Sequence, residues 1–111
     1  GDGGFMMSGM EIMTAIQYKL SLIVIILNNN SFGTIRMHQE IKFPKRKFAT
    51  DIENPDFVKL AKSMGAHGKK ITKTKDFLNF LKSNQSSNKV YVVEITSDLE
   101  EITSRKKISE L

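Results

Sequence analysis

Residues 22–27, LIVIIL, are followed at once by three asparagines, Asn28, Asn29 and Asn30. Six consecutive apolar residues, four of them β-branched, are typical of a strand buried on both faces, as in a parallel sheet. Asparagines favour turns, so they mark the end of this strand. Residues 90–95, VYVVEI, have the same character. The two stretches therefore predict two buried strands of one parallel sheet.

Residues 6–19, which precede the first of these strands, show helical spacing. Their apolar side chains fall on one face of a helix, together with the residue that follows them: Met6, Met10, Met13, Ile16 and Leu20. This spacing predicts an amphipathic helix. Methionines at such positions usually fill the hydrophobic core, and we expect the same of this stripe.

A second helix is predicted after residues 54–56, which read Asn-Pro-Asp. Asn54 is expected to cap this helix, and Pro55 is expected to occupy its first position. Apolar residues at helical spacing follow as far as Gly65, which is expected to end the helix at the C′ position.

The other segments continue the alternation of helices and strands. We expect a short helix in residues 31–40, an irregular basic loop in residues 41–53, and a short strand near residues 67–71. Thr74 is expected to cap a further helix, and residues 98–111 form a charged tail. This alternation predicts an α/β fold with a parallel sheet. About three strands are fewer than usual, so we expect a strand to be missing before the first residue.

Length and composition limit the classes of protein that the chain can represent. It has 111 residues, which allows one domain at most, and its 40% hydrophobic and 26% charged residues are typical of a soluble globular chain. No stretch approaches the roughly 18 apolar residues of a membrane span. The chain has no cysteine, which excludes disulfides and thiol chemistry and favours the cytoplasm. The net charge of +5 indicates affinity for anions without naming a partner.

Two turns that we expect to be neighbours carry the candidate site. Gly1, Asp2, Gly3 and Gly4 precede the first helix, and Asn29 follows the first strand. Ligands of open α/β sheets bind outside the carboxyl ends of the strands. Gly3 and Gly4 let the backbone approach an anion at a helix N-terminus. Mg²⁺ would join Asp2 and Asn29 to a phosphate, because it binds carboxylate, amide and phosphate oxygens. Each turn alone is more typical of an ordinary turn that binds nothing.

The spacing of these residues resembles a known motif. Residues 1–3, GDG, followed at this interval by Asn28 and Asn29, are similar to the thiamine-diphosphate motif in the C-terminal, diphosphate-binding domain of thiamine-dependent enzymes. Further stretches resemble the acetolactate-synthase-like branch: residues 1–5, 10–12, 26–33, 54–57 and 94–98. Residues 31–36 also resemble benzoylformate-decarboxylase-like members. The resemblance covers nearly the whole chain and is weakest in residues 42–52.

The resemblance implies a three-layer α/β/α thiamine-diphosphate-binding fold with a parallel sheet, truncated at its N-terminal side. Residues 1–111 would form part of that domain, and the strand at residues 22–27 would present an apolar edge. Thiamine diphosphate and Mg²⁺ are the implied cofactors. The implied metal ligands are the side chains of Asp2 and Asn29 and the backbone carbonyl of Ser31. The implied cofactor-binding residues are Gly1, Asp2, Gly3, Gly4, Asn29, Ser31, Phe32 and Gly33.

The resemblance also implies a function, as the C-terminal part of a 2-keto-acid carboligase or decarboxylase, most similar to acetolactate synthase. Such an enzyme needs an aminopyrimidine-binding domain, from the same or a partner chain, and is expected to be a homo-oligomer. The 111-residue chain alone is expected to have no turnover. Ile35 stands where pyruvate-decarboxylase-like members carry glutamate, and His38 stands where acetolactate synthases usually carry tryptophan. The keto acid therefore stays open, and His38 is a candidate acid–base residue or simply a solvated histidine.

Two alternatives have a different basis. The basic loop interleaves Phe43 and Phe48 with four cations, Lys42, Lys45, Arg46 and Lys47, as does a surface that binds nucleic acid or another anionic partner. The sequence contains no recognition motif of that class, so we expect neither a nucleic-acid nor a membrane partner. The second alternative is a non-catalytic assembly domain that keeps the fold without the activity.

Overall fold

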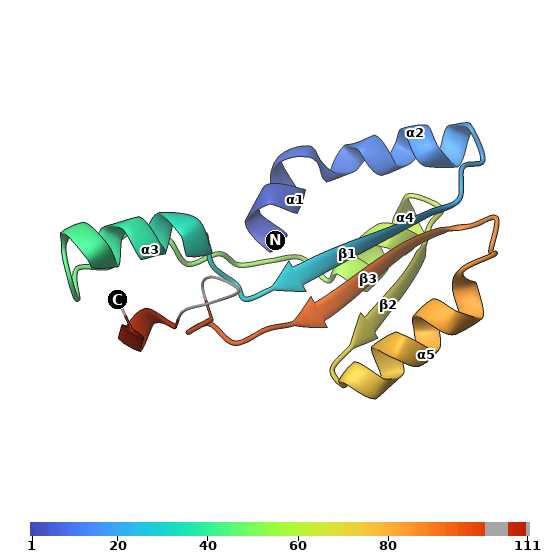
Figure 1. Cartoon of the computed structure of the whole chain (residues 1–111). Coiled ribbons are helices and arrows are strands. Elements are labelled where there is room, and N and C mark those ends of the chain that lie inside the picture. The colour runs from blue at the N-terminus through green and yellow to red at the C-terminus, as the bar shows by residue number, and fades with distance from the viewer. Residues whose placement is uncertain (102–106, 111) are drawn as a thin grey trace.

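The computed structural model of the chain, which describes residues 1–101 and 107–110, contains a three-stranded parallel sheet with helices on both faces (Figure 1). The strands are β1 (Leu22–Asn28), β2 (His67–Ile71) and β3 (Val90–Thr96), in the spatial order β1-β3-β2. In the parallel register, Ile26 of β1 pairs with Glu94 of β3, and Lys70 of β2 pairs with the same residue. The predicted α/β class and parallel sheet are confirmed.

The helices form two outer layers. The helical elements in the described residues are α1 (Asp2–Ser8), η1 (Gly9–Glu11), α2 (Ile12–Gln17), α3 (Gly33–Lys42), α4 (Phe57–Ser63), α5 (Thr74–Asn84) and η2 (Ile108–Glu110). Helices α1, α2 and α4 lie on one face of the sheet, α5 covers the other, and α3 lies beyond the carboxyl end of β1 (Figure 1). The predicted three-layer α/β/α arrangement is confirmed.

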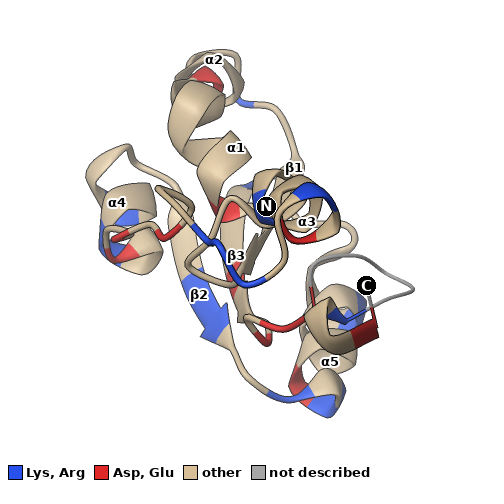
Figure 2. Ribbon diagram, turned by 90° about the vertical axis from the view of Figure 1, so that its left-hand side faces the viewer, with Lys and Arg blue, Asp and Glu red and all other residues tan. Residues whose placement is uncertain are grey.

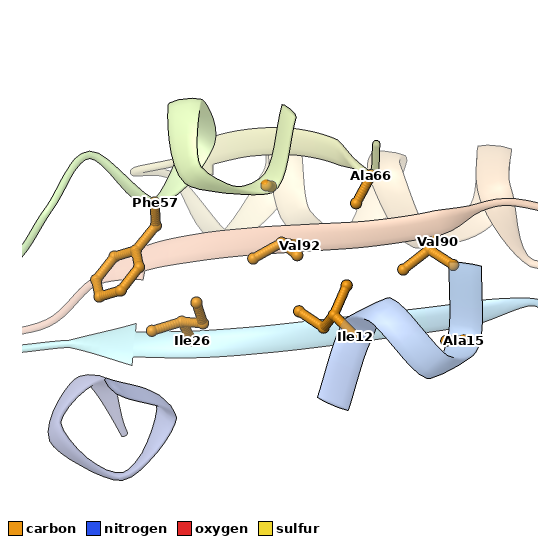
Figure 3. Close-up of a cluster of buried hydrophobic side chains, with 8 residues drawn as sticks. Ile12, Ala15, Ile26, Phe57, Ala66, Val90 and Val92 are labelled. Carbon is orange, nitrogen blue, oxygen red and sulfur yellow. The ribbon is translucent and has the colours of Figure 1, made fainter. Parts of the chain in front are cut away.

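Two apolar clusters hold these layers together. The larger cluster joins α2 and α4 to the sheet and is shown in Figure 3: Ile12, Ala15, Ile26, Phe57, Ala61, Ala66, Val90 and Val92. The smaller cluster lies under α5 and consists of Ile71, Phe80 and Val93. Helix α4 lies directly on the backbone of β2, because a Cβ atom on Gly68 would be 2.5 Å from the carbonyl oxygen of Val58. This contact fixes where α4 begins relative to the sheet.

The prediction that the methionine stripe packs in the hydrophobic core is wrong. Met6, Met10 and Met13 are 48%, 59% and 47% exposed, whereas Ile12 and Ala15 are buried against the sheet. The first helix also begins at Asp2, so the predicted turn of residues 1–4 is its first turn. Both sides of this segment carry apolar residues at helical spacing, and the side with Ile12 and Ala15 packs against the sheet, together with Ile16 from the predicted stripe.

Two of the predicted helix caps are wrong. Asp56, not Asn54, is the N-cap of α4, and its side chain accepts a hydrogen bond from the backbone N–H of Lys59 at 3.0 Å. Thr74 is the first residue of α5, after an N-cap at Lys73 that makes no side-chain bond. The prediction for Gly65 is confirmed, since it follows the last residues of α4 with a left-handed φ of +87°.

The remaining segments agree with the sequence in part. The short helix expected in residues 31–40 is present as α3, which begins two residues later and includes the first two residues of the predicted loop. Residues 44–56 form no helix or strand. Strand β1 lies at an edge of the sheet, and Leu22, Ile25 and Leu27 are 39%, 43% and 52% exposed. This confirms the apolar edge, whereas the predicted burial of this strand on both faces is wrong. The tail is described only in part, and residues 102–106 and 111 lie outside the described residues.

Charge is distributed over several elements. Figure 2 shows lysines and arginines on α3, α4, β2 and α5, with acidic residues among them. In the basic loop, Lys47 pairs with Asp51 at 2.7 Å and Arg46 lies over the ring of Phe43. No helix in the described part of the chain has the length and the hydrophobicity that crossing a bilayer requires.

The cap of α4 predicts a pH dependence of stability. The backbone N–H of Lys59 holds the pKa of the Asp56 carboxyl below its usual value of 3.8. A pKa lowered by folding contributes stability above the unfolded pKa of about 3.9, and this contribution is lost as the pH falls through the folded pKa. Asp56→Ala should therefore lower the melting temperature more at pH 7 than at pH 2, where the protonated carboxyl keeps its acceptor oxygen but not its charge. Thermal unfolding followed by circular dichroism at both pH values measures this difference.

Asp56→Asn is the matched control for this prediction. Asparagine keeps the acceptor oxygen of the cap and has no carboxyl group to titrate. It should retain much of the cap and lose the pH dependence. An equal effect of Asp56→Ala at pH 7 and pH 2 would contradict the assignment.

Candidate functional site

A hollow of about 540 Å³ opens at the carboxyl ends of the strands. It lies between the start of α1, the end of β1 and the start of α3, and Ser97 and Glu101 from the segment after β3 also line it. All eight residues that the sequence suggests for the site line this hollow: Gly1, Asp2, Gly3, Gly4, Asn29, Ser31, Phe32 and Gly33. The fold therefore brings together the two predicted turns, which are far apart in the sequence.

His38 is the exception among the candidate residues. It lies in α3, is exposed, and does not belong to the lining of the hollow. Ile35, one turn earlier in the same helix, does line it. The structure thus favours the interpretation of His38 as a solvated histidine.

The carboxylate of Asp2 is buried in this site. Asp2 is 1% exposed, and its Oδ2 atom accepts a hydrogen bond from Nδ2 of Asn54 at 2.7 Å. Within the described residues, no lysine, arginine or histidine forms an ion pair with it. A buried carboxylate is costly without a positive partner. The site therefore presents a negative charge that a bound cation would compensate.

Residues 28–31, at the end of β1, form a turn that we call the asparagine turn, and side-chain hydrogen bonds fix its geometry. The Oδ1 atom of Asn28 accepts from the backbone N–H of Asn30 at 3.0 Å, and Oδ1 of Asn29 accepts from that of Ser31 at 3.1 Å. Asn30 has a left-handed φ of +53°, which asparagine tolerates better than most residues. An amide oxygen has two lone pairs, so Asn29 retains capacity for one more partner.

Residues 50–52 lie beside this turn and hold it by hydrogen bonds. The backbone N–H of Phe32 donates to the carbonyl of Thr50 at 2.8 Å, and that of Ile52 donates to the carbonyl of Asn30 at 3.0 Å. The hydroxyl of Ser31 also donates to the Thr50 carbonyl, at 3.0 Å. Ser31 and Thr50 are 3% and 1% exposed. This segment belongs to the predicted basic loop, and sequence reasoning did not assign it a role in the site.

A chain of hydrogen-bonded polar groups continues from the site into the sheet. The Nδ2 atom of Asn28 donates to Oε1 of Glu94 at 2.9 Å, and Nζ of Lys70 donates to the same oxygen at 3.0 Å. Glu94 is 5% exposed and is therefore a second buried carboxylate. Unlike Asp2, it has a cationic partner. Asn54 links the Asp2 carboxylate to the Glu94 carboxylate through Asn28, since its Nδ2 atom also donates to Oδ1 of Asn28 at 3.0 Å.

Sequence reasoning missed Asn54, Glu94 and Lys70 as parts of this network. Asn54 precedes a proline and an aspartate, which predicts a helix cap, and Glu94 lies in a stretch that predicts a buried strand. Both residues also belong to stretches that resemble the acetolactate-synthase-like branch, but the resemblance assigns no role to either. The sequence does contain a signal for this pair. Glu94 is acidic within an apolar strand, and Lys70 lies in another expected strand, so a buried carboxylate could be expected to pair with this lysine.

The two glycines at the start of α1 differ in their surroundings. A Cβ atom on Gly3 would lie 2.6 Å from the ring of Phe32 and 3.0 Å from Cδ1 of Ile52. A Cβ atom on Gly4 would meet nothing within 4 Å. Gly3 is thus required for the close contact between α1 and the asparagine turn, whereas Gly4 leaves open space beside the hollow.

Known proteins match the chain over most of its length. A family model described as "Thiamine pyrophosphate enzyme, C-terminal TPP binding domain" matches residues 1–95. A mitochondrial acetolactate synthase of Schizosaccharomyces pombe is 34% identical over 95 residues, which cover 86% of this chain and 14% of that protein. The large subunit of acetolactate synthase isozyme 2 of Escherichia coli is 33% identical over 99 residues, which cover 88% of this chain and 18% of the relative.

A solved structure shows the same fold. The thiamine diphosphate-dependent 4-hydroxybenzoylformate decarboxylase of Rhodococcus jostii RHA1 matches with a TM-score of 0.83 and 29% identity. The match covers 91% of this chain and 19% of that protein. The chain thus spans less than a fifth of the length of these relatives.

Substitutions at Gly3 and Gly4 test the shape of the site. Gly3→Ala should destabilise the protein by about 1–3 kcal/mol, because the ring of Phe32 must move. Gly4→Ala should stabilise it by about 0.5–1 kcal/mol, because alanine favours a helix and has free space. Urea denaturation of both variants without ligands measures the difference. Equal stabilities would contradict the close contact at Gly3.

Proposed function

Because the chain belongs to the family of thiamine pyrophosphate enzyme C-terminal domains, we propose that its hollow binds the diphosphate of thiamine diphosphate through Mg²⁺. The observation that carries this proposal is the buried Asp2 carboxylate, which lines the hollow and has no cationic partner within the described residues. A cation that bridges this carboxylate and a phosphate group would compensate both negative charges.

The oxygen atoms in the hollow suit Mg²⁺. The proposed ligands are the carboxylate of Asp2, the amide oxygen of Asn29 and the backbone carbonyl of Ser31. These are hard oxygen ligands, and Mg²⁺ completes its octahedron with water and phosphate oxygens. The hydroxyl of Ser31 is already bonded to Thr50, so the proposed contact of Ser31 is through its backbone.

The glycines and the start of α3 provide the remaining contacts of the proposal. The first N–H groups of a helix have no partner within it, so those of Gly3 and Gly4 are available to a phosphate oxygen. Open space beside Gly4 lets the ligand approach the backbone. Gly1, Phe32 and Gly33 line the same hollow and are proposed to contact the cofactor.

The proposed reaction is the decarboxylation or carboligation of a 2-keto acid by an enzyme similar to acetolactate synthase. Thiamine diphosphate, when bound, supplies a nucleophilic carbon that adds to the keto group. The residues of this chain anchor and orient the diphosphate. We assign no catalytic residue to the chain, because His38 is exposed and lies outside the lining of the hollow.

The chain spans less than a fifth of the length of these relatives, so our proposal for the rest of the enzyme is based on them. We propose that an aminopyrimidine-binding domain, from the same or a partner chain, completes the cofactor site. A homo-oligomer in the cytoplasm and an inactive isolated chain are parts of the same proposal. The alternative of an anionic-partner module has less support, because Lys47 of the basic loop is paired with Asp51.

Asp2→Ala in the full-length protein tests the proposed function. The variant should lose Mg²⁺-dependent binding of thiamine diphosphate by more than about 100-fold, beyond the roughly 10–100-fold that an outer-shell change costs. Isothermal titration calorimetry with Mg²⁺, and again with a chelator, measures the affinity. The matched control is Asp76→Ala, which removes an exposed carboxylate of α5 outside the hollow and should leave the affinity unchanged.

Two outcomes would contradict the proposal. If Asp2→Ala binds the cofactor as tightly as the unsubstituted protein, Asp2 is not a metal ligand. If the unsubstituted protein does not bind thiamine diphosphate with Mg²⁺, the domain keeps the fold without the cofactor, as the assembly-domain alternative expects.

A further inference from the structure

One amide group lies among three oxygen atoms beside the hollow. The Nδ2 atom of Asn54 is 2.7 Å from Oδ2 of Asp2, 3.0 Å from Oδ1 of Asn28 and 3.1 Å from Oδ1 of Asn30. These oxygens belong to the start of α1, to the end of β1 and to the turn that follows it. Asn54 itself comes from the segment before α4. The side chain of Asn54 thus contacts one proposed metal ligand, Asp2, directly. It also contacts the two residues on either side of another proposed ligand, Asn29.

The three contacts are not equivalent. An amide nitrogen carries two protons, so three acceptors compete for them. The bond to Asp2 is the shortest, and it is strengthened by the charge of the carboxylate. The bond to Asn30 is the longest and joins Asn54 to an exposed side chain. The carboxylate of Asp2 is therefore the main partner of this amide.

Asn54 is held rigidly from both sides. The residue before a proline is restricted to extended conformations, and Pro55 follows it directly. On the N-terminal side, Ile52 is bonded through its backbone N–H to the carbonyl of Asn30. On the C-terminal side, Phe57 is 1% exposed in the core. A donor on such a segment is oriented before any ligand arrives.

We propose that Asn54 is a positioning residue for the metal ion. It engages Oδ2 of Asp2, so that the other carboxylate oxygen is directed toward the cation, and it ties Asp2 to the asparagine turn that carries Asn29. The proposal rests on the proposed function, since it concerns the same ion. Metal ligands are commonly oriented by a hydrogen bond of this kind, and its loss typically lowers metal affinity about 10–100-fold.

The experiment compares metal binding by the full-length protein and by Asn54→Leu. Leucine has the branching of asparagine and the same number of side-chain heavy atoms, but it has no donor. Mn²⁺ is the probe, because it takes the hard oxygen ligands of Mg²⁺ and has an electron paramagnetic resonance spectrum. In the presence of thiamine diphosphate, the dissociation constant for Mn²⁺ should rise about 10–100-fold in Asn54→Leu. The spectrum of the Mn²⁺ that still binds should also change.

Two matched variants separate positioning from a general loss of structure. Asn79→Leu makes the same replacement at an exposed position of α5, on the other face of the sheet, so its Mn²⁺ affinity should stay within twofold of the unsubstituted protein. Asp56→Ala weakens α4 two residues after Asn54 without touching the site, and it should also leave the affinity unchanged. Thermal unfolding without ligands compares the stabilities of all three variants.

Each outcome decides between the proposals. If the unsubstituted protein binds neither Mn²⁺ nor thiamine diphosphate, the proposed function fails, and this proposal fails with it. If the unsubstituted protein binds both and Asn54→Leu binds Mn²⁺ with the same affinity and spectrum, only the positioning role is overturned. The role is also overturned if Asp56→Ala weakens Mn²⁺ binding as much as Asn54→Leu does. If Asn54→Leu does not fold, Asn54→Ser, whose hydroxyl is too short to reach Asp2, decides by the same measurements.

Discussion

The burial of the Asp2 carboxylate is the constraint on which the site depends. Removing an ionised carboxylate from water costs several kcal/mol, and one hydrogen bond from a neutral amide offsets only part of that cost. The described part of the chain buries two such carboxylates, Asp2 and Glu94, which are joined through the amides of Asn54 and Asn28. Lys70 neutralises Glu94, whereas Asp2 has no cation within the described residues. This asymmetry identifies Asp2 as the position where a positive charge is needed.

The layers of the fold place this carboxylate beside its partners. Strand β1 delivers the asparagine turn to the carboxyl edge of the sheet, and α1 begins at the same edge. Gly3 allows α1 to approach the ring of Phe32, and Gly68 allows α4 to lie on β2. Since α4 is fixed on the sheet, the segment before it holds Asn54 against both turns. Packing that is remote from the hollow thus determines the geometry inside it.

Sequence reasoning predicted the parts of this account that depend on short-range patterns. The apolar runs at residues 22–27 and 90–95 form β1 and β3, as predicted, but only β3 is buried along most of its length, because β1 lies at the edge of the sheet. The spacing of Asp2 and Asn29 placed both residues in one hollow, because parallel strands end at the same edge of a sheet. These predictions needed no knowledge of tertiary contacts.

The predictions that were wrong depend on competition between similar residues. Asn54 and Asp56 are both good helix caps, and the sequence does not show that Asn54 is engaged by Asp2 instead. The methionine stripe and the stripe with Ile12 are both apolar, and only packing against the sheet selects the second. Long-range partners such as Glu94 with Lys70 were also missed, because they meet only through the strand order.

A crystal structure of the full-length protein with Mn²⁺ and thiamine diphosphate, with the metal located by its anomalous scattering, tests the central claim most directly. The account predicts a metal ion about 2.0–2.3 Å from the Asp2 carboxylate oxygen that Asn54 does not engage, with Asn54 still bonded to Oδ2. A metal ion elsewhere, or an Asp2 that turns away from the hollow while the cofactor is bound, would contradict it.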